Sequence, residues 1–191
     1  GTLVSFSKGL KPHVIFTYTK FIKNRTQGNG PLITKIMCKS LHEVLHNISK
    51  DGLHKASALG YGSSIKSVYY MLSSPWAISQ AKKVFIDFEK ETTVTEKIIK
   101  EITDKESLVL IKEFKQDLEK SSSSNVDLLP IEEKVFDVRL NGYSISEFKG
   151  KKANKLEISL AVSVSSKKIL EKIGSEVHKM FHIKNEFFHG A

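Results

Sequence analysis

One short stretch of the sequence has residue types that could bind a phosphate group. Gly60 and Gly62 flank Tyr61, and two serines and Lys66 follow within the next four residues. Glycines allow a tight turn with exposed backbone N–H groups. A serine can cap a new helix, and a helix N-terminus attracts anions. The stretch reads as the end of a strand, a glycine turn and the start of a helix, which predicts a small phosphate-binding corner. The alternative is that it is only a turn between strand and helix.

The residue types that catalysis needs do not form a comparable group in the sequence. His42 and His46 are spaced to share a metal ion on a helix, but no third ligand follows at a suitable spacing. Cys38 is the single cysteine, so it excludes an internal disulfide and fits a reducing compartment. The carboxylates concentrate in residues 87–133, where a solvated helix face accounts for them. We therefore expect neither enzymatic activity nor a metal or cofactor site.

The charges are unevenly spread along the chain. Residues 1–86 carry 12 Lys and Arg against 2 Asp and Glu, residues 87–133 carry 7 against 13, and residues 134–191 carry 11 against 6. A basic domain with an acidic segment inside it is typical of a protein that binds polyanions. The alternative is a solvated surface that is rich in lysine.

No apolar run approaches the roughly 18 residues that a membrane span needs. No charged and then apolar leader is visible at the first residues of the sequence either. We therefore expect no membrane partner and a location in the cytoplasm, the nucleus or both.

The apolar spacing predicts alternating strands and helices over the first half of the chain, followed by a helical segment and further strands. Strands are predicted over residues 13–19, 53–59, 82–88, 136–140 and 156–164. Helices are predicted over residues 32–50, 63–72, 93–104, 108–120 and 167–181. Asn141 and Gly142 form the strongest hairpin-turn pair in the sequence.

Two motifs in this order resemble the Alba family. Ser57-Ala58-Leu59-Gly60, followed by Ser64-Ile65-Lys66-Ser67-Val68, resembles the Alba strand that ends in a glycine turn and leads into a helix. The segment from Lys155 to Leu160 is similar to the closing strand of eukaryotic Alba proteins. The resemblance covers residues 13–88 and 136–170. The glycine turn here has one residue more than the usual pattern, and the loop before the last strand is far longer.

The resemblance implies an α/β fold with a two-layer Alba-like β-α-β-α-β-β core, an acidic helical insertion before the last strand, and a C-terminal helix. Residues 12–91 would form the first part of this domain and residues 92–133 the insertion. Residues 134–182 would supply the last strands and the C-terminal helix. Because long surface insertions cost little loop entropy, we expect that deleting the insertion leaves a folded protein.

The resemblance also implies a non-catalytic protein that contacts RNA or DNA mainly through the phosphate backbone, as a homodimer or as a heterodimer with an Alba-like chain. The alternative is an Alba-like protein subunit of RNase P or RNase MRP that acts as a heterodimer. Tyr18 and Tyr61 could stack on unpaired bases. The residues that match the family's contact positions are Lys20, Lys23 and Arg25 in the first loop, Gly60, Tyr61, Gly62 and Lys66 in the glycine turn, and Lys149, Lys151, Lys152 and Lys155 in the late basic turn.

Overall fold

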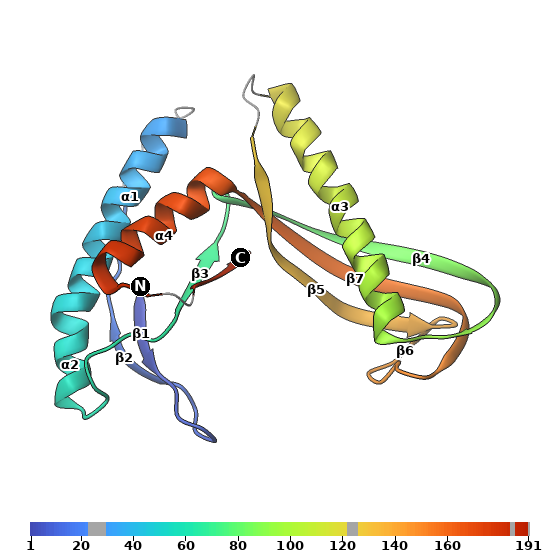
Figure 1. The fold of residues 1–191 in the computed structure, drawn as a ribbon, viewed down its shortest axis with the longest axis horizontal. Helices are drawn as coiled ribbons and strands as arrows, with labels where there is room; N and C mark the ends of the chain where they lie inside the picture. The colour runs from blue at the N-terminus through green and yellow to red at the C-terminus, as the bar shows by residue number, and fades with distance from the viewer. Residues whose placement is uncertain (23–29, 122–125, 184–185, 191) are drawn as a thin grey trace. The chain divides into compact units, whose positions relative to one another are not determined.

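The computed structural model describes residues 1–22, 30–121, 126–183 and 186–190 (Figure 1). The fold is mixed α/β, as the sequence predicts. The chain divides into two compact units, of which unit 1 comprises Gly1–Tyr69 and Lys168–Phe187, and unit 2 comprises Tyr70–Lys167 and Phe188–Ala191. In the part of the chain that the structure describes, no helix is long and apolar enough to cross a membrane.

Unit 1 is built from a hairpin and a long helical run. The antiparallel strands β1 (Thr2–Ser5) and β2 (His13–Thr17) form the hairpin. The helical run joins α1 (Gly30–Asn47), the π-helical turn η1 (Ile48–Gly52) and α2 (Leu53–Ala58) without a break. Helix α4 (Lys167–Phe181) belongs to this unit from its second residue onward.

The strands β3 (Val68–Leu72) and β8 (Glu186–Gly190) form a two-stranded sheet. The boundary between the units passes through both strands. In unit 1 the ring of Tyr69 stacks on Phe187 with 4.9 Å between ring centroids, and in unit 2 Tyr70 stacks on Phe188 at 4.5 Å. These aromatic pairs join residues that are far apart in the sequence.

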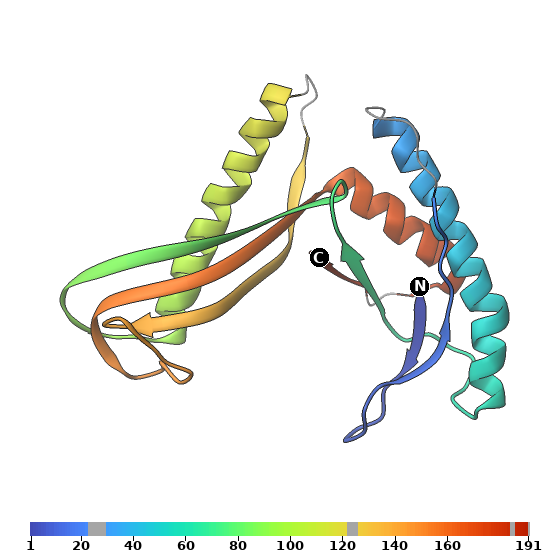
Figure 2. The same cartoon turned by 180° about the vertical axis from the view of Figure 1, so that it is seen from behind.

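Unit 2 contains an antiparallel sheet with the strand order β4-β7-β5-β6. Its strands are β4 (Ala77–Thr93), β5 (Leu128–Leu140), β6 (Tyr143–Ser144) and β7 (Lys152–Ser166). Helix α3 (Glu96–Ser121) crosses one face of this sheet (Figures 1 and 2). Leu110 of α3 and Ile158, Leu160 and Val162 of β7 are fully buried between helix and sheet.

Several predicted elements are confirmed. The helix over residues 167–181 has the predicted bounds, and the strands over residues 82–88, 136–140 and 156–164 lie within β4, β5 and β7. Asn141 and Gly142 form the turn before β6, with φ angles of 52° and 89°. Both angles are positive, which is why asparagine and glycine are favoured at these two positions.

Two predicted elements are wrong, and two predicted helices are one continuous helix. Residues 53–58 are helical rather than a strand, because the helix before them continues through η1, and Leu59 lies in the turn that follows. Residues 63–67 contain no helix, and Val68 begins β3, whose tyrosines stack on aromatic residues of β8. The two helices expected over residues 93–120 are the single helix α3, because no glycine or proline interrupts this segment.

The acidic segment over residues 92–133 lies entirely within unit 2. That this segment was inserted into an older domain stays a prediction from the sequence. The packing nevertheless reverses one expectation, since α3 supplies Ile99, Leu110 and Phe114 to the core that it shares with the sheet. Deleting the segment should therefore unfold unit 2, because the apolar face of the sheet would be exposed to water.

Candidate nucleic-acid interface

The glycine turn ends a helix instead of beginning one. The backbone N–H of Gly60 donates to the carbonyl of Ser57 at 3.0 Å, and the N–H of Tyr61 donates to the carbonyl of Ala56 at 3.0 Å. This pair of bonds is the Schellman motif, in which a residue with positive φ terminates a helix. Gly60 has a φ of 78°. The turn thus satisfies the last carbonyls of α2, at the helix end where the dipole is negative.

The strand–turn–helix geometry that motivated a phosphate-binding corner is therefore wrong. Lys66 is exposed and has no partner among the described residues, but no helix N-terminus lies beside it. Tyr61 is partly exposed, and its ring lies 5.6 Å from that of His13. Contact of Gly60, Tyr61, Gly62 or Lys66 with nucleic acid stays a prediction, now without the support of a helix dipole.

The first loop offers less free charge than the sequence implied. The ammonium group of Lys20 lies 2.9 Å from Glu43 Oε1, and the hydroxyl of Tyr18 donates to the same oxygen at 2.8 Å. The positive charge of Lys20 is thus already shared with a carboxylate. Lys23 and Arg25 lie outside the residues that the structure describes.

The late basic turn lies in unit 2, and three of its four lysines face carboxylates. Lys149 pairs with Glu96 at 3.3 Å, Lys152 with Glu91 at 3.7 Å, and Lys155 with Asp87 at 4.0 Å. Lys151 has no ion-pair partner among the described residues. The paired side chains are all largely exposed, so these ion pairs are weak and a phosphate could displace the carboxylates.

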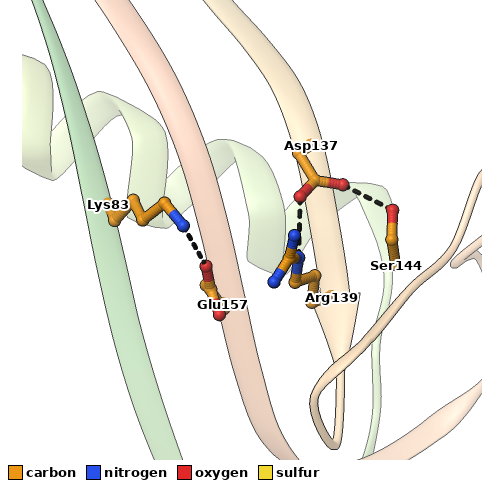
Figure 3. A network of polar contacts seen from close by, with 5 residues as sticks. All are labelled: Lys83, Asp137, Arg139, Ser144 and Glu157. Atoms are coloured by element: carbon orange, nitrogen blue, oxygen red, sulfur yellow. Dashed lines mark hydrogen bonds and ion pairs between the residues drawn. The ribbon is translucent and has the colours of Figure 1, made fainter.

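A polar network on the unit 2 sheet also neutralises its cations (Figure 3). The Lys83 ammonium lies 3.0 Å from Glu157, while Asp137 accepts hydrogen bonds from Ser144 at 2.7 Å and from Arg139 at 2.9 Å. The bond from Ser144, together with that from Arg139, lowers the pKa of the Asp137 carboxyl. This network therefore offers no unpaired cation to a polyanion.

The net positive charge of the protein belongs to unit 1. The residues of unit 1 include 14 Lys and Arg against 5 Asp and Glu, whereas those of unit 2 include 16 of each kind. The division into units thus places the whole formal charge of +9 in unit 1. A polyanion would be attracted to this unit.

The long helical run of unit 1 exposes a continuous line of basic side chains. Between Ile33 and Lys50, every residue that is exposed is a lysine or a histidine. The spacing of three to four residues places these side chains on one helical face. We define the basic ridge as Lys35, Lys39, His42, His46, Lys50 and His54.

The π-helical turn keeps the last member of the basic ridge, His54, on this face. In an uninterrupted α-helix Lys50 would still lie on this face, one turn after His46, but Leu53 would take the place of His54. The wider turn over Ile48–Gly52 rotates the following residues, so that His54 is exposed and Leu53 is half-buried; Asp51 and Lys55 are exposed as well. Gly52 at the end of this turn packs against β2, where a Cβ atom would lie 3.1 Å from the ring of Phe16. π-Helical turns are often found at functional sites.

Two carboxylates lie near the lysines of the basic ridge, since the exposed Asp51 follows Lys50 and Glu43 lies one turn after Lys39. In the described part of the chain the basic ridge forms one ion pair, between His42 Nδ1 and Glu176 Oε2 of α4 at 3.5 Å. Glu176 also accepts a hydrogen bond from Lys179, which is the main reason why the pKa of its carboxyl is lowered. The three lysines of the ridge have no ion-pair partner among the described residues, so their charges face solvent.

An exposed aromatic side chain lies beside the N-terminal part of the basic ridge. Lys39 and Lys20 line a shallow depression of about 400 Å³ together with Phe21, Ile22 and Ile36. The side chain of Phe21 is 86% exposed. An aromatic ring next to lysines is an arrangement on which an unpaired base can stack.

The basic ridge is the site that the sequence interpretation missed. Its signal was present, because Lys35, Lys39, His42 and His46 recur at helical spacing within the helix predicted over residues 32–50. The spacing of the two histidines alone suggests a shared metal ion, whereas the same spacing continued through the two lysines indicates a basic helix face. In the described residues, no group of three or more His, Cys, Asp or Glu side chains is placed to hold a metal ion.

Neither the comparison with protein-family models nor that with curated proteins finds a match for this chain.

Proposed function

We propose that this protein binds nucleic acid through the phosphate backbone, without catalysis, and that the basic ridge of unit 1 makes the principal contacts. The observation that carries this proposal is that each exposed residue from Ile33 to Lys50 is a lysine or a histidine. A helix face with no other role would ordinarily mix acidic and polar residues with its lysines.

The dimensions of the basic ridge suit a nucleic-acid backbone. From Lys35 to His54 the helical run extends about 28 Å at the usual rise per residue. One strand of a duplex presents a phosphate about every 3.4 Å along its axis. Lysine side chains placed along such a length contact phosphates as point charges and read no base edges. We therefore expect affinity with little sequence preference.

The proposal covers both RNA and DNA. Phe21, beside Lys39, adds a ring that could stack on an unpaired base, which favours single-stranded targets. The histidines of the ridge add positive charge when they are protonated. Neither feature distinguishes ribose from deoxyribose.

Membership of the Alba family is a separate proposal, and it rests on the sequence motifs alone. The order of elements differs from the pattern that the motifs imply, since α2 occupies the place of the second strand and β3 that of the second helix. The role as a subunit of RNase P or RNase MRP depends on that membership. Binding by the basic ridge depends on neither.

The proposal is tested with a labelled RNA of about 25 nucleotides and the matching DNA duplex, titrated between about 50 and 200 mM salt. Affinity should fall by one or more decades over this range, and Lys39→Glu should weaken binding at every salt concentration. The matched control is Lys172→Glu, which makes the same charge change on an exposed residue of α4 in the same unit. Absent binding at low salt, or equal losses in both variants, would refute the proposal.

A further inference from the structure

The outer edge of β4 in unit 2 is long and open. Strand β4 has 17 residues and, in the described chain, pairs only with β7. From Ala77 to Asp87 this pairing is regular and contains no bulge. An open edge strand presents a row of free N–H and C=O groups, which are a template for pairing with another strand.

The opposite edge of the same sheet is protected against such pairing. Strand β5 carries Pro130, and its register with β7 shifts between Pro130 and Glu132 and again between Val135 and Asp137. A proline and β-bulges are the usual means by which an edge strand avoids pairing. Strand β4 has no proline and no bulge up to Asp87. The β4 edge therefore permits pairing with another strand, whereas the β5 edge opposes it.

The middle of β4 carries an exposed aromatic residue between opposite charges. Val84 and Ile86 pack toward the core with α3, so the alternation of the strand directs Lys83, Phe85 and Asp87 to the other face. The side chain of Phe85 is 70% exposed. A large apolar side chain on a free edge is a feature that a partner would cover.

We propose that β4 pairs with β4 of a second copy of this chain, antiparallel and centred on Phe85. In this register Phe85 lies opposite Phe85 of the second copy, and Lys83 lies opposite Asp87. On the other face, Val84 lies opposite Ile86. Directly opposite residues interact through their side chains, so the pairing combines an aromatic contact, two apolar contacts and two ion pairs. The pairing is isologous, as a two-fold axis requires.

The charges select this register over its neighbours. Moving the centre to Ile86 places Lys82 opposite Lys90 of the second copy, and moving it to Asp87 places two Asp87 carboxylates together. A centre at Val84 aligns no opposite charges. Like charges directly opposite each other destabilise a strand pair. The register centred on Phe85 is thus the one that joins opposite charges without opposing like charges.

Lys82 could have prevented this pairing, because a lysine that points inward at an edge usually blocks association. Here its ammonium group lies 2.8 Å from Glu106 of α3, and this hydrogen bond raises the pKa of Lys82. The charge is thereby satisfied within unit 2. Lys83 likewise has Glu157 as its partner, and it can add Asp87 of the second copy as a further one.

This inference is independent of the proposed function, but the two would reinforce each other. Pairing through the neutral unit 2 gives one particle with two copies of the basic unit 1. Two linked binding surfaces raise the apparent affinity for a long polyanion without any new contact.

The test is the mass of the full chain in solution, measured by light scattering or sedimentation across a concentration series. We expect association toward twice the 21.5 kDa of one chain. Phe85→Lys places two ammonium groups on the two-fold axis and should raise the dimer dissociation constant by about tenfold or more. The control is Phe136→Lys, since Phe136 of β5 is 57% exposed and lies away from the β4 edge.

Cross-linking gives a second measurement that does not depend on a disruptive charge. Phe85→Cys on a Cys38→Ser background should form a disulfide between two copies on oxidation, because opposite residues in a strand pair lie close enough. Phe136→Cys on the same background should not form one. A monomer at all concentrations, equal effects of the two lysine variants, or equal cross-linking by the two cysteine variants would overturn the proposal. Mass and RNA titration are separate readouts, so either proposal can fail alone.

Discussion

Tyr18 and Lys20 both donate hydrogen bonds to a single oxygen atom, Oε1 of Glu43, at 2.8 Å and 2.9 Å. The segment that follows β2 is thereby tied to α1. The bond from Lys20, and then that from Tyr18, lowers the pKa of the Glu43 carboxyl. The same bonds to Glu43 raise the pKa of the Tyr18 hydroxyl and that of the Lys20 ammonium group.

These shifts predict how the stability of unit 1 depends on pH. Because the folded-state pKa of Glu43 is lowered, its contribution is present above the unfolded pKa and is lost as pH falls through the folded value. The raised values of Tyr18 and Lys20 give contributions that are present below their unfolded pKa values and are lost at alkaline pH. Melting curves of Glu43→Gln should therefore show a weaker dependence on pH at both ends.

The control for this prediction is Glu171→Gln, since Glu171 is an exposed carboxylate of α4 with no ion pair among the described residues. That variant should keep the pH dependence of the wild type. The differences will be small, because the side chains of Lys20 and Glu43 are 41% and 37% exposed and water screens their interaction. Identical pH profiles for Glu43→Gln and the wild type would contradict the prediction.

Sequence patterns predicted those elements in which the local spacing of apolar residues matches the face that packs against the rest of the protein. The helix over residues 167–181 has apolar residues at helical spacing, and large apolar residues occur at every second position along most of β7, as in a strand. At residues 51–52 the local signal misled us. Asp51-Gly52 is a typical helix stop, but here Gly52 packs closely against Phe16 of β2, where a Cβ atom would lie 3.1 Å from the ring. The packing of Gly52 thus depends on a contact with another element of the fold, and such a contact cannot be read from a pattern along the chain.

The candidate site was predictable in part for the same reason. The excess of positive charge in residues 1–86 correctly indicated where the charge of the molecule lies. Which lysines are free was not predictable, because ion pairs such as that of Lys149 with Glu96 join residues 53 positions apart. The strongest motif lies at the Gly60 turn. Whether this turn begins a helix or ends one depends on whether the segment before it is a strand or a helix, which the motif does not contain.

The basic ridge predicts a graded loss of nucleic-acid binding. Each of Lys35→Ala, Lys39→Ala and Lys50→Ala should reduce the affinity by about 1 kcal/mol and the salt slope by about one phosphate contact. Thermal stability should hardly change, because these side chains are exposed. Salt titrations of the three variants beside Lys149→Ala compare the ridge with a late-turn lysine that already has a carboxylate partner. A larger loss for Lys149→Ala would move the interface to unit 2.

Helix α3 is part of the unit 2 core, and two leucines on it provide a matched test. Leu110 is fully buried, whereas Leu108 is 60% exposed. Leu110→Ala should destabilise the protein by about 2–5 kcal/mol, since it removes buried apolar contacts and leaves a cavity. Leu108→Ala should change the free energy of unfolding by less than about 0.5 kcal/mol. Equal effects in urea unfolding would show that α3 does not pack on the sheet as described.

For Ser107 we expect that truncation does not lower the free energy of unfolding. Its hydroxyl is buried one turn before the Leu110–Phe114 segment and has no hydrogen-bond partner among the described residues. A buried polar group without a partner costs about 1–3 kcal/mol, so Ser107→Ala should leave stability unchanged or increase it by up to that amount. Thr103 is the control, because its hydroxyl donates to the Ile99 carbonyl at 2.8 Å. Thr103→Val should destabilise the protein, and a comparable loss for Ser107→Ala would mean that its hydroxyl is bonded.

Substitutions of Gly60 distinguish a purely structural role of the glycine turn from a role in nucleic-acid binding. The φ of Gly60 is 78° and a Cβ atom added there would have no atom within 4 Å, so an alanine would meet no clash and only conformational strain. Gly60→Ala should therefore destabilise unit 1 by about 1–2 kcal/mol, the usual difference for an L-residue in the left-handed region. Gly60→Asn should be milder, because asparagine tolerates that region and is common at helix C-termini. If the turn is only a helix stop, both variants keep full affinity for RNA at temperatures where they are folded. A loss of affinity in Gly60→Asn with unchanged melting would restore the turn, with Tyr61 and Lys66, to the binding surface.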